Sequence, residues 1–195
     1  MYDYIRSIND LIYWEIRVPE KSIYSPSSFS MIKADKKTIQ NICKYVRDNI
    51  IPSSNIKIIV NDDALDDGYC KGKCTDKYFN GGHCGALKSS LFILPDGKVS
   101  ICELLYWHPQ FIVGDLKKQS LEEIWRSDKV MSLYNQKREY YRDESFCSKC
   151  KSFDFCSENH RKCWIKIIRT YGSENWDYPD PRCEYATKQL EVTYI

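Results

Sequence analysis

The chain has 195 residues, of which 43% are hydrophobic, and its 29 basic and 27 acidic side chains leave a formal net charge of +2. This length fits one or two small domains, the hydrophobic content excludes a disordered chain, and the balanced charge argues against a nucleic-acid partner. The first residues contain no apolar signal-peptide core, and the longest apolar runs are too short to span a bilayer. We therefore expect a cytoplasmic protein with no membrane partner, in which thiols stay reduced.

Residues 1–63 are predicted to form a helix, a strand, a helix and a strand. Leu11–Val18 has the β-branched and aromatic residues of a strand, and Asp35 is expected to cap the following helix. Four apolar residues recur on one face of that helix: Ile39, Ile42, Cys43 and Val46. The helix should end before Pro52, and Ile56–Val60 should be a strand covered on both faces in a parallel sheet. One βαβ unit cannot cover its own strands, so we expect a slice of a larger α/β domain.

A polar, loop-rich stretch follows, and we place the start of a second domain, residues 64–195, there. Ser90–Leu94 and Lys98–Cys102 flank the turn sequence Pro95-Asp-Gly97 and predict a β-hairpin. Gly97 is needed for the turn, where the φ angle is expected to be positive.

Short helices are predicted after the hairpin. Ser120-Leu-Glu-Glu123 has the pattern of a capping box that opens a helix. Three residues of this helix are expected to point inward: Leu121, Ile124 and Trp125. Phe146–Cys163 is predicted as cysteine-rich loop, Trp164–Arg169 as a helix with Gly172 as its C-cap, and the tail around Pro179 as extended chain. The predicted fold class is α+β.

The chain has ten cysteines, and their density in the second domain indicates metal ligation rather than disulfides. The first block is Cys84-x12-Gly97-x4-Cys102, in which the predicted hairpin brings two thiols together. Metal ligands must be thiolates, so a bound metal would also fix their protonation state.

The second block begins with Cys147-x2-Cys150, where a tight turn places both thiols on the same side. Cys156 follows on a short loop, Cys163 comes seven residues later, and Cys183 closes the set. The spacing alone does not separate four-thiolate zinc sites from iron–sulfur clusters, because both use four cysteines.

Other candidate ligands have simpler interpretations. Cys43 lies on the apolar face of a predicted helix and is expected to be a small buried hydrophobic residue. Three histidines could ligate a metal, but each is expected to be a surface or hydrogen-bonded residue: His83, His108 and His160.

These cysteine blocks resemble the SPASM domain, the C-terminal extension of radical S-adenosylmethionine enzymes, many of which modify peptides or activate sulfatases. Leu91–Cys102 and Val113–Trp125 are similar to the hairpin and helix of that domain, and the resemblance covers about residues 70–187. It implies a small cysteine-rich domain with a β-hairpin, short helices and metal-binding loops. In residues 1–63 it implies the remnant βαβ units of a partial (β/α) barrel.

The resemblance implies two auxiliary [4Fe–4S] clusters held in interleaved fashion. The first would be bound by Cys84 and Cys102, an upstream cysteine, and the fourth cysteine of the second block. The second would be bound by Cys147, Cys150, Cys156 and Cys183.

Two of these ligands have alternatives. Upstream we expect Cys74, which is nearer to Cys84 than the alternative, Cys70. In the second block the usual family gap falls on His160; we expect Cys163 instead, because one helical turn can bring it onto the same face.

The chain departs from the family at the catalytic loop. Radical S-adenosylmethionine enzymes need Cys-x3-Cys-x2-Cys at the start of the barrel, whereas Cys70-x3-Cys74 is followed by Lys77 at the third position. We therefore expect a fragment that is inactive alone, with S-adenosylmethionine bound only by a longer enzyme; the alternative is a divergent module that works with a partner.

The resemblance implies a function in a peptide- or protein-modifying enzyme of the maturase type. The clusters would transfer electrons or contact the substrate, and the partners would be that substrate, an electron donor and the missing barrel. Two other classes stay open from the residues: a non-catalytic zinc-stabilised interaction module, and a free-standing electron-transfer protein.

Overall fold

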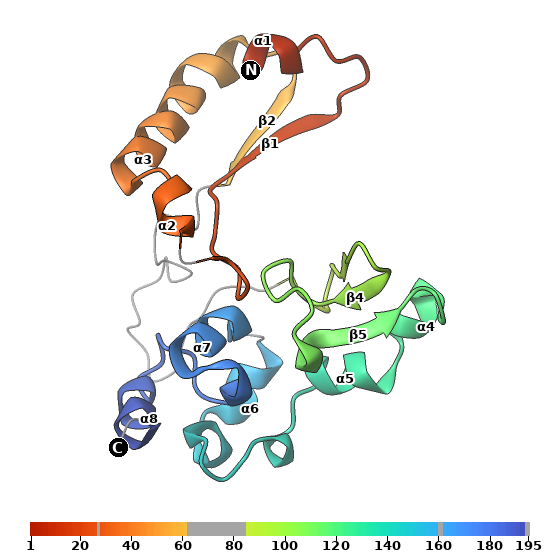
Figure 1. The fold of residues 1–195 in the computed structure, drawn as a ribbon, viewed down its shortest axis with the longest axis vertical. Helices are drawn as coiled ribbons and strands as arrows, with labels where there is room; N and C mark the ends of the chain where they lie inside the picture. The colour runs from red at the N-terminus through yellow and green to blue at the C-terminus, as the bar shows by residue number, and fades with distance from the viewer. Residues whose placement is uncertain (27, 62–84, 160–161, 194–195) are drawn as a thin grey trace. The chain divides into compact units, whose positions relative to one another are not determined.

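The structure is a computed structural model that describes residues 1–26, 28–61, 85–159 and 162–193. Over these ranges the chain combines helices with two small sheets, which confirms the α+β class (Figure 1). It divides into two compact units, Met1–Lys21 with Pro26–Tyr69 and Ser22–Ser25 with Cys70–Ile195. The domain boundary that we predicted near residue 64 lies outside the described residues. Within the described ranges, no helix is long and apolar enough to cross a bilayer.

The first unit is built on two parallel strands, β1 (Tyr13–Arg17) and β2 (Lys57–Asn61), in the register that pairs Trp14 with Ile58. The predicted βαβ unit is therefore present. Its other elements are three helices and two short irregular turns: α1 (Tyr2–Ile5), α2 (Phe29–Ile32), α3 (Lys36–Tyr45), η1 (Val46–Ile50) and η2 (Ile51–Ser53).

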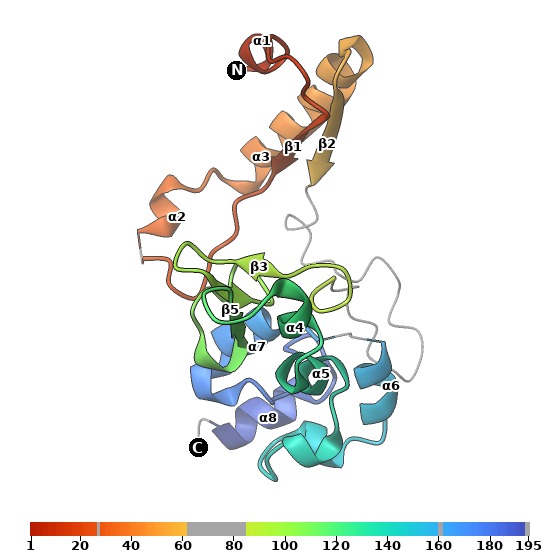
Figure 2. The same cartoon turned by 90° about the vertical axis from the view of Figure 1, so that its right-hand side faces the viewer.

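Helix α3 packs along the two strands (Figures 1 and 2) and is capped as predicted, because the Asp35 carboxylate accepts a hydrogen bond of 2.9 Å from the Thr38 backbone N–H. Its buried residues Ile39 and Cys43 form a small cluster with Val18. The burial expected of Cys43 is confirmed. The α-helix ends well before Pro52, as predicted, and Pro52 itself lies in the turn η2.

One expectation for the first unit is wrong. Ile42 is 50% exposed, because the apolar stripe of α3 is narrower than the four residues suggested. The predicted strand β2 is present; its Val60 packs on the core of this unit, whereas Ile59 is 37% exposed, so coverage of both faces by a larger domain stays a prediction.

The second unit opens with the predicted hairpin, formed by β3 (Phe92–Ile93) and β4 (Lys98–Ser100). Gly97 has a φ angle of +86°, as the turn requires. A third strand that we did not predict, β5 (Ile112–Asp115), pairs antiparallel with β4.

Helices surround this sheet and supply the rest of the core. Helix α4 (Leu121–Trp125) lies beside β5 (Figures 1 and 2), and its Ile124 is fully buried in the main cluster. The remaining elements are η3 (Pro109–Phe111), α5 (Asp128–Tyr134), η4 (Arg138–Tyr140), η5 (Phe146–Lys149), α6 (Phe153–Glu158), α7 (Trp164–Tyr171), η6 (Ser173–Asn175) and α8 (Ala186–Thr193).

The predicted capping box of α4 is confirmed, since the side chains of Ser120 and Glu123 each accept a hydrogen bond from the backbone N–H of the other residue. The prediction that Leu121 points inward is wrong; it is 47% exposed, because a helix of five residues buries only a single row. Helix α7 ends at Gly172 as predicted, whereas the stretch predicted as loop contains α6 and the tail predicted as extended contains α8.

Gly114 in β5 lies directly against Ile124: a Cβ atom built on Gly114 would be 2.4 Å from Ile124 Cγ1. We expect Gly114→Ala to lower the free energy of unfolding by about 1–3 kcal/mol through overpacking. Urea denaturation would measure the loss. In an Ile124→Ala background, which removes the clashing atoms, the same substitution should cost much less; an equal cost in both backgrounds would contradict the packing argument.

Candidate metal centre

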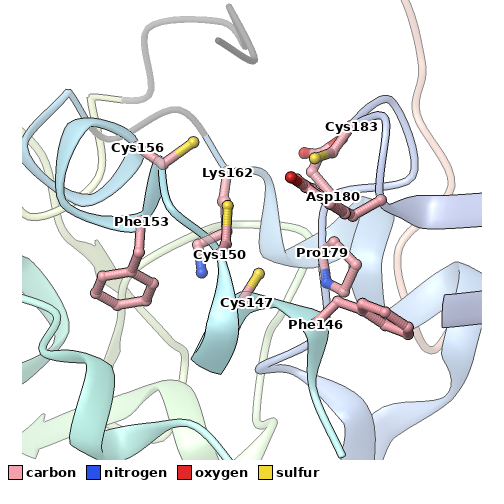
Figure 3. Close-up of a pocket in the computed structure, with 10 residues that line it drawn as sticks. Phe146, Cys147, Cys150, Phe153, Cys156, Lys162, Pro179, Asp180 and Cys183 are labelled. Carbon is pink, nitrogen blue, oxygen red and sulfur yellow. The ribbon is translucent and has the colours of Figure 1, made fainter. Parts of the chain in front are cut away.

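Four cysteines from three segments line one pocket in the second unit (Figure 3). Cys147 lies in η5, Cys150 directly after it, Cys156 in α6, and Cys183 in the turn before α8. Their neighbours around the pocket are mostly apolar, with one lysine and one aspartate: Phe146, Phe153, Lys162, Pro179, Asp180 and Tyr185. The structure thus brings together the four cysteines that the resemblance assigned to one cluster.

The Cys147-x2-Cys150 turn is closed by its own backbone and by an arginine. The Cys150 N–H donates to the Cys147 carbonyl at 3.2 Å. Arg138 donates from Nη1 to the carbonyls of Ser148 and Cys150, at 3.1 and 2.7 Å, and its guanidinium lies 4.8 Å from the Phe153 ring centroid. Arg138 therefore fixes the turn that presents two of the four thiols.

The chain just before Cys147 is held by a buried glutamine in α8. The Phe146 N–H donates to Gln189 Oε1 at 2.9 Å, and Gln189 Nε2 donates to the Glu144 carbonyl at 3.1 Å. The Gln189 side chain is fully buried. Helix α8, which the sequence did not predict, thus positions the start of the thiol pocket.

A second buried group, Asp177, supports the same loop from another side. Its carboxylate accepts hydrogen bonds of 3.0 Å from the Arg142 backbone N–H and from Arg142 Nε. Its carbonyl accepts one of 2.8 Å from Ser145 Oγ. Ser145 in turn accepts from the Cys147 N–H at 3.1 Å, which connects the buried carboxylate to the first ligand turn.

Asp180 joins two of the predicted ligand positions. Its carboxylate accepts a hydrogen bond of 2.9 Å from the backbone N–H of Cys163, the N-cap residue of α7, and pairs with Arg182 at 2.7 Å. Its carbonyl accepts one of 2.8 Å from the Cys183 N–H. Because the Asp180 side chain is fully buried, this arrangement ties the start of α7 to the turn that carries Cys183.

The pocket raises the pKa values of its thiols. Burial raises the pKa of Cys156 to about 11 and that of Cys183 to about 12, and it raises the pKa of Cys147 as well. The charge of Lys162 acts in the opposite direction on Cys147 and Cys156. Because a metal binds thiolates, loading of this pocket must displace protons and bring positive charge into it.

Lys162 is buried among these thiols. Its Nζ atom donates a hydrogen bond to the Tyr141 hydroxyl and lies 4.0 Å from the Tyr141 ring centroid and 5.7 Å from that of Phe153. Burial would lower the pKa of Lys162, but Tyr141 and Cys147 outweigh that effect and hold it above its ordinary value. The pocket therefore combines four thiols with one ammonium group.

The donor set fits a cofactor that takes four thiolates. The thiols line one small pocket rather than meeting at one point. Within the described residues, no three side chains of His, Cys, Asp or Glu are grouped so that they could hold a single metal ion. Four cysteines around a largely apolar pocket match the number of thiolate ligands that an iron–sulfur cluster takes.

The ligand set expected for the first cluster is only partly visible. Cys102 and Cys163 are half-buried and pack on the main core, and Cys102 Sγ accepts a hydrogen bond of 3.5 Å from the Leu104 N–H. The other candidates lie outside the described residues: Cys70, Cys74, His83, Cys84 and His160. The helical turn expected to carry Cys163 is not continuous with α6, which ends at Glu158, and Cys163 has an extended backbone.

His108 is a hydrogen-bonded residue, as expected, since its Nε2 atom lies 3.2 Å from the Ser173 carbonyl in a buried position. Five supporting residues were not identified from the sequence: Arg138, Lys162, Asp177, Asp180 and Gln189. None of them carried a local signal in the sequence, because each acts through contacts with residues distant along the chain.

The family comparison agrees with this geometry. Residues 84–151 match the model of SPASM, an iron–sulfur cluster-binding domain. The resemblance drawn from the cysteine spacing is confirmed over this segment. The SPASM segment contains Cys84, Cys102, Cys147 and Cys150, so the pocket combines two thiols inside it with two beyond its end. No curated protein matches the chain.

We expect Asp180→Asn to reduce the free energy of unfolding by about 3 kcal/mol, because it leaves Arg182 without its buried ionic partner. Anaerobic urea denaturation would measure the change. The matched control is Asp154→Asn, which removes a carboxylate that is 77% exposed and lies 3.6 Å from Arg138; it should cost less than about 1 kcal/mol. Equal losses in the two variants would contradict the role assigned to Asp180.

Proposed function

We propose that this chain binds two [4Fe–4S] clusters and forms the auxiliary-cluster portion of a radical S-adenosylmethionine enzyme that modifies a peptide or protein. The observation that carries the proposal is the convergence of four thiols on one pocket, two of them inside the SPASM segment. Iron–sulfur binding is the property that this segment indicates; the number and type of clusters are part of the proposal.

The ligands follow from the pocket and from the resemblance. Cys147, Cys150, Cys156 and Cys183 hold one cluster. Cys102 and Cys163 contribute to the other, together with Cys84 and Cys74, which lie outside the described residues. Support for this division comes from Asp180, which contacts the backbone of both Cys163 and Cys183 and so joins the two ligand sets.

The chain's own residues supply ligation, burial and hydrogen bonds. Thiolates bind the iron, the apolar walls of Phe146, Phe153 and Pro179 limit access of water, and the Leu104 N–H donates to the sulfur of Cys102. Burial and hydrogen bonds to sulfur set the reduction potential of such a centre. The bound clusters supply one-electron chemistry, either for electron transfer or for contact with the substrate.

The first unit is proposed to be the last βα part of the partial barrel that performs the radical chemistry. Support comes from its parallel pair of strands, since parallel sheets are normally covered on both faces by further elements. Ile59 and Tyr13 on these strands are 37% and 49% exposed and would be covered by such elements. The substrate, the electron donor and S-adenosylmethionine would then be bound by the larger assembly.

Metal content tests the cluster assignment directly. We expect about eight irons and eight sulfides per chain after anaerobic reconstitution, because each cluster holds four of each. The brown absorption should bleach on reduction. Cys156→Ala should lower the iron content by about half, whereas Cys43→Ala, which removes a buried thiol of the first unit, should leave it unchanged.

The same analysis of metal and sulfide content distinguishes the proposed function from the alternatives. Zinc without iron or sulfide would overturn the proposal in favour of a zinc-stabilised interaction module. About four irons that vanish in Cys156→Ala would limit the chain to the one cluster whose four ligands line the pocket.

If the radical chemistry takes place in the missing barrel, the 195-residue chain should not cleave S-adenosylmethionine. Lys77 stands where the third cysteine of the catalytic loop is needed. Incubation of the loaded, reduced chain with the cofactor, followed by chromatography for 5′-deoxyadenosine, measures this. Multiple turnovers would show that the chain carries a radical-generating site of its own.

A further inference from the structure

Lys162 occupies an unusual position for a charged side chain. Only 8% of the residue is exposed, and it is the one basic residue among the described residues that line the thiol pocket. Figure 3 shows its side chain among the residues that line this pocket. A charge in such a place needs an anion nearby, because burial of an isolated ammonium group is strongly unfavourable.

No carboxylate supplies that anion within the described part of the chain. The buried aspartates of the described residues are both paired with arginines, Asp177 with Arg142 and Asp180 with Arg182. The ammonium group of Lys162 contacts the Tyr141 hydroxyl and two aromatic rings, which orient it without neutralising it. The groups that can neutralise it are the thiolates that a bound metal would form from Cys147, Cys150 and Cys156, which line the same pocket.

The ammonium group is held in place by a chain of buried contacts. The Tyr141 hydroxyl that accepts its hydrogen bond donates in turn to Gln136 Oε1. The Tyr141 ring packs edge-on against Phe153, with ring centroids 4.9 Å apart. The position of the Lys162 ammonium group in the pocket is therefore set by Tyr141 and its neighbours rather than by attraction to a thiolate alone.

We propose that Lys162 is the built-in counter-charge of the four-thiolate site formed by Cys147, Cys150, Cys156 and Cys183. This inference rests on the proposed function, since it concerns the cluster that these thiols bind. Four thiolates give the loaded site a net negative charge, and one-electron reduction makes it more negative. A fixed positive charge in a water-poor pocket stabilises the loaded form over the empty form and the reduced form over the oxidised form.

Removal of the Lys162 charge should affect the metal-free and the metal-loaded chain differently. Lys162→Met keeps a flexible side chain of similar length but removes the charge. Replacement of a buried charge by an apolar side chain is often neutral or stabilising, so the metal-free variant should be at least as stable as the parent chain. The loaded variant should release iron faster to a chelator. A residue that serves only packing would weaken both forms.

The reduction potential provides the decisive measurement. In an anaerobic redox titration followed by electron paramagnetic resonance, Lys162→Met should lower the equilibrium constant for reduction at least tenfold, which is about 59 mV toward negative potential. The signal is assigned to the pocket by its absence in Cys156→Ala. Lys162→Arg retains the charge and should stay near the parent value. Lys129→Met, which removes a lysine outside the pocket, should also leave it unchanged.

Each outcome decides for or against the counter-charge. A negative shift in Lys162→Met with retention in Lys162→Arg supports it, and equal shifts in both, or none, overturn it. If Lys162→Met fails to load, the metal-free stability decides: a stable empty chain supports the inference, and a destabilised one overturns it. Iron and sulfide content of the parent chain is measured first, so failure of the cluster assignment is recognised separately.

Discussion

The second unit depends on a buried carboxylate, that of Asp180, which holds two distant parts of the chain at the thiol pocket. It binds the N–H at the start of α7 and the guanidinium of Arg182, and its backbone carbonyl holds the turn of Cys183. A buried charge of this kind is costly unless every contact is made. The contacts therefore fix one arrangement of these segments, and the pocket takes its position from that arrangement.

Buried polar side chains also fix the other side of the pocket, where hydrogen bonds rather than apolar packing hold the backbone in place. Gln189 and Asp177 are fully buried, and each holds the backbone just ahead of Cys147. Arg138 then closes the turn up to Cys150. Short helices and turns of this kind bury too little apolar surface to be rigid alone, so satisfied buried hydrogen bonds give the thiols a defined place before any metal binds.

Much of the scaffold could be predicted because its signals are local. The hairpin at Gly97, the capping box at Ser120 and the paired thiols at Cys147 and Cys150 depend on residues a few positions apart. The rest depends on tertiary contacts. The short strand β5 is set by pairing with β4, and Lys162 is buried only because Tyr141, twenty-one positions away, folds over it. Residue type alone predicts an exposed lysine, so the charge in the pocket could not be predicted.

Two cations near this site, Arg138 and Lys162, differ in their exposure to solvent. Arg138 is 39% exposed and shares its guanidinium with the exposed Asp154, so mobile ions screen its effect on the thiols. Lys162 is buried, interacts with the thiols through protein and aromatic rings, and is screened far less. Arg138 accordingly acts through geometry, by holding carbonyls, whereas Lys162 acts through charge. Of these two cations, the buried lysine is therefore the one proposed to control the electrostatics of the site.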